Sequence, residues 1–283
     1  MFLGPLYIDP LYLVIFVLTL VISAGAQLFI SSAYRKWSQV RNSAGLNGAQ
    51  VGQQIVSRSA LGHVDHAPAV SVESPELKKL TGLRDKGVIT EQEYQAKKRQ
   101  IQQEQSRRSV AASSVHFERT RGQLTDHYDP RSHTVRMSEG VATQPSVASM
   151  AIVAHELGHA QQHENHSPLI AMRNFLVPAV RFSPQLAYVL ILVGLIFNIA
   201  GLFWLGIVFY GLMVLFSILT LPVELDASRR ALKLLDETGL MQTEADVQGS
   251  RRVLTAAATT YIAAAVTAVL QLLYYISIAR RRR

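Results

Sequence analysis

Three long stretches of the chain carry no charged residue: 11–32, 182–223 and 253–279. About 20 mostly apolar residues are enough for one helix to cross a bilayer. The middle stretch is roughly twice that length and contains Asn198 and Gly201, which favour a tight turn and therefore two spans. We expect four transmembrane helices, at about 11–30, 185–199, 202–221 and 253–279.

The polar sequence between the first two spans predicts short helices and a small β-hairpin. Asn47 can cap a helix that carries Val51 and Ile55 on one face. Residues 116–138 alternate in places between apolar and polar positions, and Asp-Pro-Arg-Ser at 129–132 is typical of a turn. The expected fold is therefore a mainly α membrane protein, with about four transmembrane helices and an α+β region that includes a β-hairpin.

Residues 74–103 predict a self-contained helical hairpin. Ser74 and Pro75 suit a helix start, and Thr90 with Glu93 forms a capping box for a second helix. Gly87 can end the first helix. Apolar positions on the two helices are Leu77, Leu80, Leu83, Tyr94 and Ile101. The segment resembles the SHOCT module, which implies self-association or a protein partner; a solvated hairpin without a special role is the alternative.

The spans divide the chain into five expected regions: an N-terminal anchor (1–32), a catalytic region (33–181), a transmembrane hairpin (182–223), a polar helical region (224–252) and a C-terminal span with a basic tail (253–283). Lys and Arg beside spans mark the cytoplasmic side. With four spans, one side collects Arg35, Lys36, Arg41, Arg173, Arg181, Arg229, Arg230, Lys233, Arg251 and Arg252. Both polar regions are thus expected in the cytoplasm. The tail 280–283 contradicts this assignment, because four spans would place its four arginines outside the cytoplasm.

Composition narrows the classes of function. The chain has 283 residues, is 49% hydrophobic and has a net charge of +8. Such a charge could indicate a nucleic-acid partner, but its position beside the spans explains it as membrane topology, so no nucleic acid is expected. The chain has no cysteine, so any metal site must use histidine and carboxylate ligands.

Residues 155–159 read His-Glu-Leu-Gly-His, in a segment that Ser146 or Thr143 can cap as a helix running to about His163. Histidines at i and i+4 lie on one helix face, about one turn apart. His155 and His159 can therefore bind one Zn²⁺, with Glu156 beside them as the base for a zinc-bound water. The alternative is two solvated histidines at a polar helix end.

A catalytic zinc needs a third protein ligand. The metzincin pattern fails, because residues 162 and 165 are Gln and Asn. His163 lies a further turn along the helix and His166 lies near its end, so both are disfavoured. Glu224 follows the third span, where Pro222 can start a helix, and the transmembrane hairpin returns it to the side of the histidines. Complementing the helix dipole is the alternative role for Glu224.

The segments VRNSAGLNGAQV, LTDHYDPRSHTVRMSEGV, AHELGHAQQH and TLPVELDASRRALKLL resemble the YugP-like family of neutral zinc metallopeptidases, which are bacterial membrane proteins. The resemblance covers most of the chain and implies His155, Glu156 and His159 in zincin roles, with Glu224 as the third ligand by similarity to gluzincins. The chain departs from the family's usual form between about 64 and 113, where the SHOCT-like hairpin is inserted.

The expected function is a zinc-dependent metalloendopeptidase in the bacterial plasma membrane, with a cytoplasmic site that acts on peptides or membrane proteins. In the hairpin region, His127, Tyr128 and His133 are candidates to stabilise the oxyanion, and Asp126 or Asp129 to orient a ligand histidine. Arg229 is a further candidate for such a supporting role. The alternatives are a protease that cleaves within the bilayer and a non-catalytic membrane scaffold with a vestigial metal site.

Overall fold

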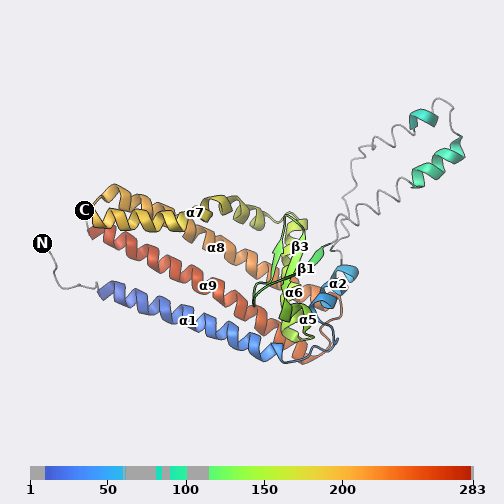
Figure 1. Cartoon of the computed structure of the whole chain (residues 1–283), viewed down its shortest axis with the longest axis horizontal. Helices are drawn as coiled ribbons and strands as arrows, with labels where there is room; N and C mark the ends of the chain where they lie inside the picture. Colours follow the sequence, from blue (N-terminus) through green and yellow to red (C-terminus); the bar gives the residue numbers. More distant parts are fainter. Residues whose placement is uncertain (1–9, 60, 62–80, 85–89, 101–114, 282–283) are drawn as a thin grey trace.

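The computed structural model describes residues 10–59, 61, 81–84, 90–100 and 115–281. Four long helices run side by side, and the short helices and strands gather at one end of them (Figure 1). The four are α1 (Pro10–Ser38), α7 (Pro168–Ile196), α8 (Ala200–Glu237) and α9 (Glu244–Arg281). All four are long and apolar enough to cross a membrane, which confirms the expected number of spans within the described residues.

The surface of these helices is apolar. Exposed side chains include Leu28 at 70%, Phe175 at 83% and Tyr188 at 68%. A soluble monomer rarely exposes large contiguous apolar patches, whereas a bilayer supplies an apolar solvent for them.

The expected turn between α7 and α8 is present at 197–199, where Asn198 has φ +55°. Asparagine tolerates this left-handed conformation better than most residues. α7 begins much earlier than residue 185, however, and passes through Pro178 and Pro184. Beside the second proline, the Ser183 hydroxyl donates to the Ala179 carbonyl at 2.6 Å.

Pro222 was expected to start a helix, and this expectation is wrong. It lies inside α8, which continues without a break to Glu237. One rigid helix therefore carries both a membrane span and Glu224. Likewise, α9 begins at Glu244, ahead of the expected span, so these helices cross the region boundaries expected at 223 and 252.

The sheet has three strands, β1 (His116–Thr120), β2 (His127–Asp129) and β3 (Thr134–Ser138), in the order β1-β3-β2. β2 and β3 form the expected antiparallel hairpin around the 129–132 turn. β1 instead pairs parallel to β3, so the expectation of a plain hairpin over 116–138 is wrong at its start. Parallel strands need a crossover, and the chain makes it through 121–126 and β2, helped by Gly122 at φ +103°.

The core of this region surrounds α6 (Val147–Glu164), which packs against the sheet, α2 (Gly48–Arg58), α5 (Glu139–Thr143), α8 and α9. Its buried apolar side chains include Val147, Met150, Val153 and Leu157. At Gly158, an added Cβ would lie 2.4 Å from the Ala227 carbonyl oxygen. The glycine therefore allows α6 to approach α8 closely enough for their side chains to share a site.

Two expected caps are present. The Ser146 hydroxyl accepts from the Ser149 amide at 3.1 Å at the start of α6. Asn47 and Gln50 form a reciprocal capping box at the start of α2, where Val51 and Ile55 are buried.

Only part of the 74–103 segment lies within the described residues. There, 81–84 and 91–100 are helical. The Thr90 amide donates to Glu93 at 2.9 Å and the Glu93 amide to the Thr90 hydroxyl at 3.3 Å, as the capping box predicts. Tyr94 is buried beneath the Arg84 guanidinium. The expectations for Ser74, Pro75, Leu77, Leu80, Gly87 and Ile101, and for residues 282–283 of the tail, fall outside the described residues.

Candidate metal centre

The structure brings His155, His159 and Glu224 together, where α6 crosses α8. The two imidazole rings stand one turn apart on α6, with centroids 4.8 Å apart. From α8, Oε2 of Glu224 lies 3.3 Å from Nε2 of His155 and 3.4 Å from Nε2 of His159. One potential ligand atom from each residue lies within 4.8 Å of the other two.

The geometry fits a tetrahedral cation. Ligand atoms ~2.1 Å from such an ion lie about 3.4 Å apart, close to the two distances from Glu224. Its side chain is only 4% exposed, and Oε2 is a buried atom with no hydrogen-bond partner among the residues that the structure describes. A buried carboxylate oxygen without a partner is costly, and a cation would satisfy it. Two imidazoles and a carboxylate are a known zinc-ligand set.

Protons compete for this site. Burial lowers the pKa of His159, but the nearby carboxylates of Glu224 and Glu156 outweigh burial, so that its pKa lies above the ordinary value. Ligand histidines must be neutral to bind a metal. The carboxylates that attract a metal ion thus also attract a proton, so metal affinity should fall as the pH is lowered.

A buried network supports the His159 ring, and our sequence analysis missed it. Nδ1 of His159 lies 3.0 Å from Oε1 of Gln162, and Nε2 of Gln162 donates to the Val223 carbonyl and to Asp226, both at 2.8 Å. Arg230 in turn donates to Asp226 at 2.7 Å. With Nδ1 donating to the glutamine, Nε2 is left to face the metal. The sequence signal for this contact was an amide side chain, that of Gln162, three residues after His159.

The His155 ring also has a partner that we did not predict. The Ser228 hydroxyl lies 3.3 Å from Nδ1 of His155. Ser228 is one turn after Glu224 on α8, so one helix face supplies both a candidate ligand and a residue that supports another. The i, i+4 spacing to Glu224 was the signal.

Two further side chains approach the centre from the membrane helices. The Tyr261 hydroxyl, from α9, interacts with Glu224 and feels the charges of Glu156 and of Arg173 on α7. Nε of Arg173 is buried and has no hydrogen-bond partner within the described residues. Tyr261 was missed because it lies inside an apolar segment that we considered only as a span.

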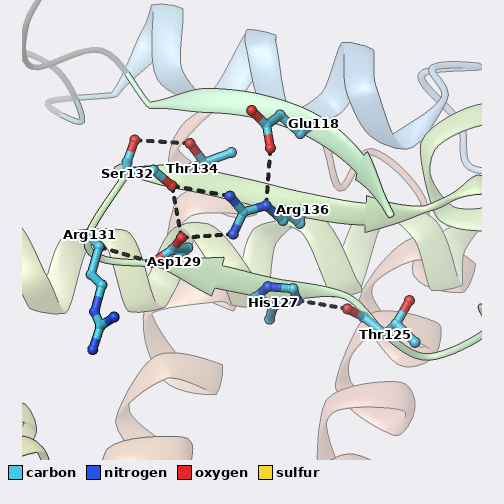
Figure 2. Close-up of polar contacts among 8 residues, drawn as sticks. All are labelled: Glu118, Thr125, His127, Asp129, Arg131, Ser132, Thr134 and Arg136. Carbon is cyan, nitrogen blue, oxygen red and sulfur yellow. Dashed lines mark hydrogen bonds and ion pairs between the residues drawn. The ribbon is translucent and has the colours of Figure 1, made fainter. Parts of the chain in front are cut away.

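Three of the expected supporting residues make their described contacts elsewhere, and a fourth is exposed. Asp126 accepts from the Ser138 amide at 2.7 Å, and the exposed His127 ring meets the Thr125 carbonyl at 2.8 Å. Asp129 pairs with Arg136 at 2.7 Å across the hairpin (Figure 2). Arg229 is exposed on α8.

The Asp129 interactions stabilise the sheet. Hydrogen bonds from Arg136, the Arg131 amide and Ser132 lower the pKa of Asp129 to about 2. The carboxylate is therefore ionised at neutral pH and joins the turn to β3.

Tyr128 and His133 belong to a second cluster, at the far end of α6. The Tyr128 hydroxyl lies 2.6 Å from Nδ1 of His133 and 3.3 Å from Nδ1 of His163. Nε2 of His133 lies 3.2 Å from Oε1 of Glu164. These contacts join β2 and the adjoining turn to α6, and none of them reaches His155, His159 or Glu224.

The fold and this centre together define a helical membrane protein with a histidine–carboxylate site where its membrane helices meet a small α+β region. The family model described as "Putative neutral zinc metallopeptidase" matches residues 12–72 and 106–280. The chain belongs to this family. A second model, "Short C-terminal domain" or SHOCT, matches residues 76–101, as the resemblance implied.

A curated relative agrees with this family. It is "Putative membrane protease YugP" of Bacillus subtilis (strain 168), 38% identical over 164 residues, which cover 58% of this chain and 72% of the relative. No solved structure matches the chain.

Proposed function

We propose that this protein is a zinc-dependent metalloendopeptidase of the bacterial plasma membrane, with its active site on the cytoplasmic face. The observation that carries the proposal is the buried Glu224 oxygen, which lies 3.3 and 3.4 Å from the two histidine nitrogens and has no hydrogen-bond partner in the described part of the chain. Membership of a zinc-peptidase family and similarity to a membrane protease support the same conclusion.

His155, His159 and Glu224 would hold the zinc, which when bound would activate water and polarise the scissile carbonyl. Glu156 is 7% exposed and lies next to His155 on α6. Its role is to take a proton from the attacking water and to pass it to the leaving amine. The support of His159 by Gln162 keeps the ligand nitrogen directed at the metal position.

Tyr261 and Arg173 are proposed to act on the substrate. The Tyr261 hydroxyl lies near both Glu224 and Glu156, and can donate a hydrogen bond to the oxygen that becomes negative during attack. Arg173, whose Nε is buried without a partner, adds positive charge on the same side. Neither role needs deprotonation of the tyrosine.

The cytoplasmic orientation rests on the positive-inside rule. The basic residues at the end of α1 and early in α9 lie at the same end of the four helices as α6 (Figure 1). If that end is cytoplasmic, the metal centre is cytoplasmic as well.

The substrates are proposed to be peptides or loops of membrane proteins near the bilayer surface. β2 is an edge strand and packs against α6, the helix that carries His155 and His159, so an extended peptide can add to the sheet next to this helix. The helical segment within 74–103 is proposed to bind a protein partner or a second copy of the chain, as its family match suggests.

The test uses the detergent-solubilised full-length protein and Glu156→Gln. We expect one zinc per wild-type chain by elemental analysis, and cleavage of an unstructured protein such as casein. Glu156→Gln should keep the zinc and lose on the order of 10²–10⁴-fold in rate. Wild type without zinc, or an unchanged rate in Glu156→Gln, would contradict the proposal and favour a scaffold.

A further inference from the structure

A basic pocket lies between α1 and α9, at the same end of the helices as the metal centre. It has a volume of about 630 Å³, and its lining includes Ser32, Lys36, Trp37, Gln248, Arg251 and Arg252. The first three belong to the last turns of α1 and the others to the early turns of α9. These positions adjoin the apolar parts of both helices, where phospholipid headgroups meet a membrane protein.

The three cations of this pocket have no acidic partner within the described residues. By contrast, Arg230 and Lys233 on α8 pair with Asp226 and Glu237. Of the two acids that open α9, Asp246 accepts from the Ser43 and Thr243 amides, and Glu244 accepts from the Gln248 amide at 2.7 Å. The pocket therefore keeps its positive charge.

Aromatic contacts hold two of the cations in place. The Lys36 ammonium lies 5.0 Å from the Trp37 ring centroid, and the Arg252 guanidinium lies 4.5 Å from the ring of Phe29 on the neighbouring helix. Such contacts orient a cation without neutralising it. Side chains held in this way lose less freedom on binding an anion.

We propose that this pocket binds the phosphate headgroup of an anionic phospholipid. Basic pockets between membrane helices recognise such headgroups, and each cation near the surface contributes to the attraction. The apolar flanks of α1 and α9 receive the acyl chains. The Ser32 hydroxyl donates to the Phe29 carbonyl at 2.9 Å and the Gln248 amide to Glu244 at 2.7 Å, so recognition of the headgroup rests on the three cations.

The pocket also adjoins the joint between the membrane anchor and α6. Trp37 packs so closely on Gly249 that an added Cβ there would lie 2.5 Å from the indole ring and 2.6 Å from Val147. Just beyond α1, the Val147 amide donates to the Val40 carbonyl at 2.9 Å. A lipid in this pocket therefore rests against the residues that hold the start of α6.

Native mass spectrometry of the full-length protein tests the proposal, in detergent with equal amounts of phosphatidylglycerol and phosphatidylcholine. We expect wild type to retain phosphatidylglycerol with a preference of about tenfold or more, and Lys36→Gln/Arg251→Gln/Arg252→Gln to lose it. Ser32→Glu, which places an acid at an exposed position in the pocket, should lose it too. If both variants preferred phosphatidylglycerol as strongly as wild type does, the proposal would be overturned.

The matched control is Arg121→Gln/Arg131→Gln/Lys233→Gln, which removes the same charge from exposed positions outside the pocket. It should keep the wild-type preference, and an equal loss there would show attraction by bulk charge alone. Glycerol phosphate has the anionic group without acyl chains. Its displacement of the lipid would show a site for soluble phosphates instead. None of these readouts depends on peptidase activity, so they separate this proposal from that of the function.

Discussion

Helix α6 carries two clusters that each contain two histidines and a glutamate, and only one of them is arranged for a metal. Around His155 and His159, the Glu224 carboxylate points between the two rings. Around His133 and His163, the Tyr128 hydroxyl occupies the equivalent position and bonds to both rings. Of the described residues, only the first cluster brings three potential ligand atoms within 4.8 Å of one another. Both clusters contain the same kinds of ligand residue, so what distinguishes the metal site is that its ligand atoms converge on one point.

The supporting contacts differ in the same way. Gln162 directs the His159 nitrogen toward the metal position. In the other cluster the Tyr128 hydroxyl contacts Nδ1 of both rings, and Oε1 of Glu164 lies 3.2 Å from Nε2 of His133 only, also without a hydrogen-bond partner among the described residues. Glu224 thus faces a nitrogen of both rings in the first cluster, whereas in the second the tyrosine contacts both rings and holds β2 against α6.

The largest expected effect comes from exchanging a ligand. Glu224→Gln should reduce bound zinc from about one per chain to near zero and the peptidase rate on the order of 10³-fold, because a neutral amide is a poor zinc ligand. His133→Ala/His163→Ala is the matched change in the second cluster and should keep its zinc. Elemental analysis measures the zinc content of both variants. Zinc loss in His133→Ala/His163→Ala would contradict the distinction between the two clusters.

Removing the Tyr261 hydroxyl should affect chemistry without affecting the metal. Tyr261→Phe is expected to lower kcat by ~10²-fold, as the loss of one oxyanion donor does, with KM nearly unchanged. Zinc content should equal that of wild type. Tyr128→Phe is the control in the second cluster, and an equal fall in its kcat would remove the distinction between the two hydroxyls.

Loss of the Gln162 support should weaken zinc binding but not abolish it. Gln162→Leu leaves the ligands in place and removes the partner of the His159 ring, so zinc affinity should fall by ~10–100-fold. Competition with a chromophoric chelator measures this. An affinity equal to that of wild type would show that helix packing alone orients the histidine.

The smallest effect concerns the sheet beside the second cluster. The pKa of Asp129 is lowered in the folded protein to about 2, so its ionised form contributes stability above its ordinary pKa near 4, and this contribution is lost as the pH falls toward 2. Asp129→Asn should lower the thermal midpoint slightly at pH 7, with a gap that narrows below pH 4. A gap that widens on acidification would contradict the pKa shift.

Local sequence patterns predicted the local features. Charge-free length predicted the four spans, and capping residues predicted the starts of α2 and α6. The i, i+4 spacing predicted that two histidines share one face of α6. The errors came where local rules compete with packing: Pro222 suits a helix start, yet α8 continues through it, and 116–120 suits a hairpin, yet pairs parallel to β3.

By itself, therefore, the sequence determined four helices long and apolar enough to cross a membrane and a histidine pair on one helix face, because this information lies within a few turns of chain. Only the tertiary structure decided which acid meets those histidines and that Gln162 and Tyr261 join them. It also placed three cations between α1 and α9 that have no acidic partner among the described residues, whereas Arg230 and Lys233 on α8 are paired. These contacts join residues far apart in the chain, and they form only when whole helices pack, as the close approach of Gly158 to α8 allows.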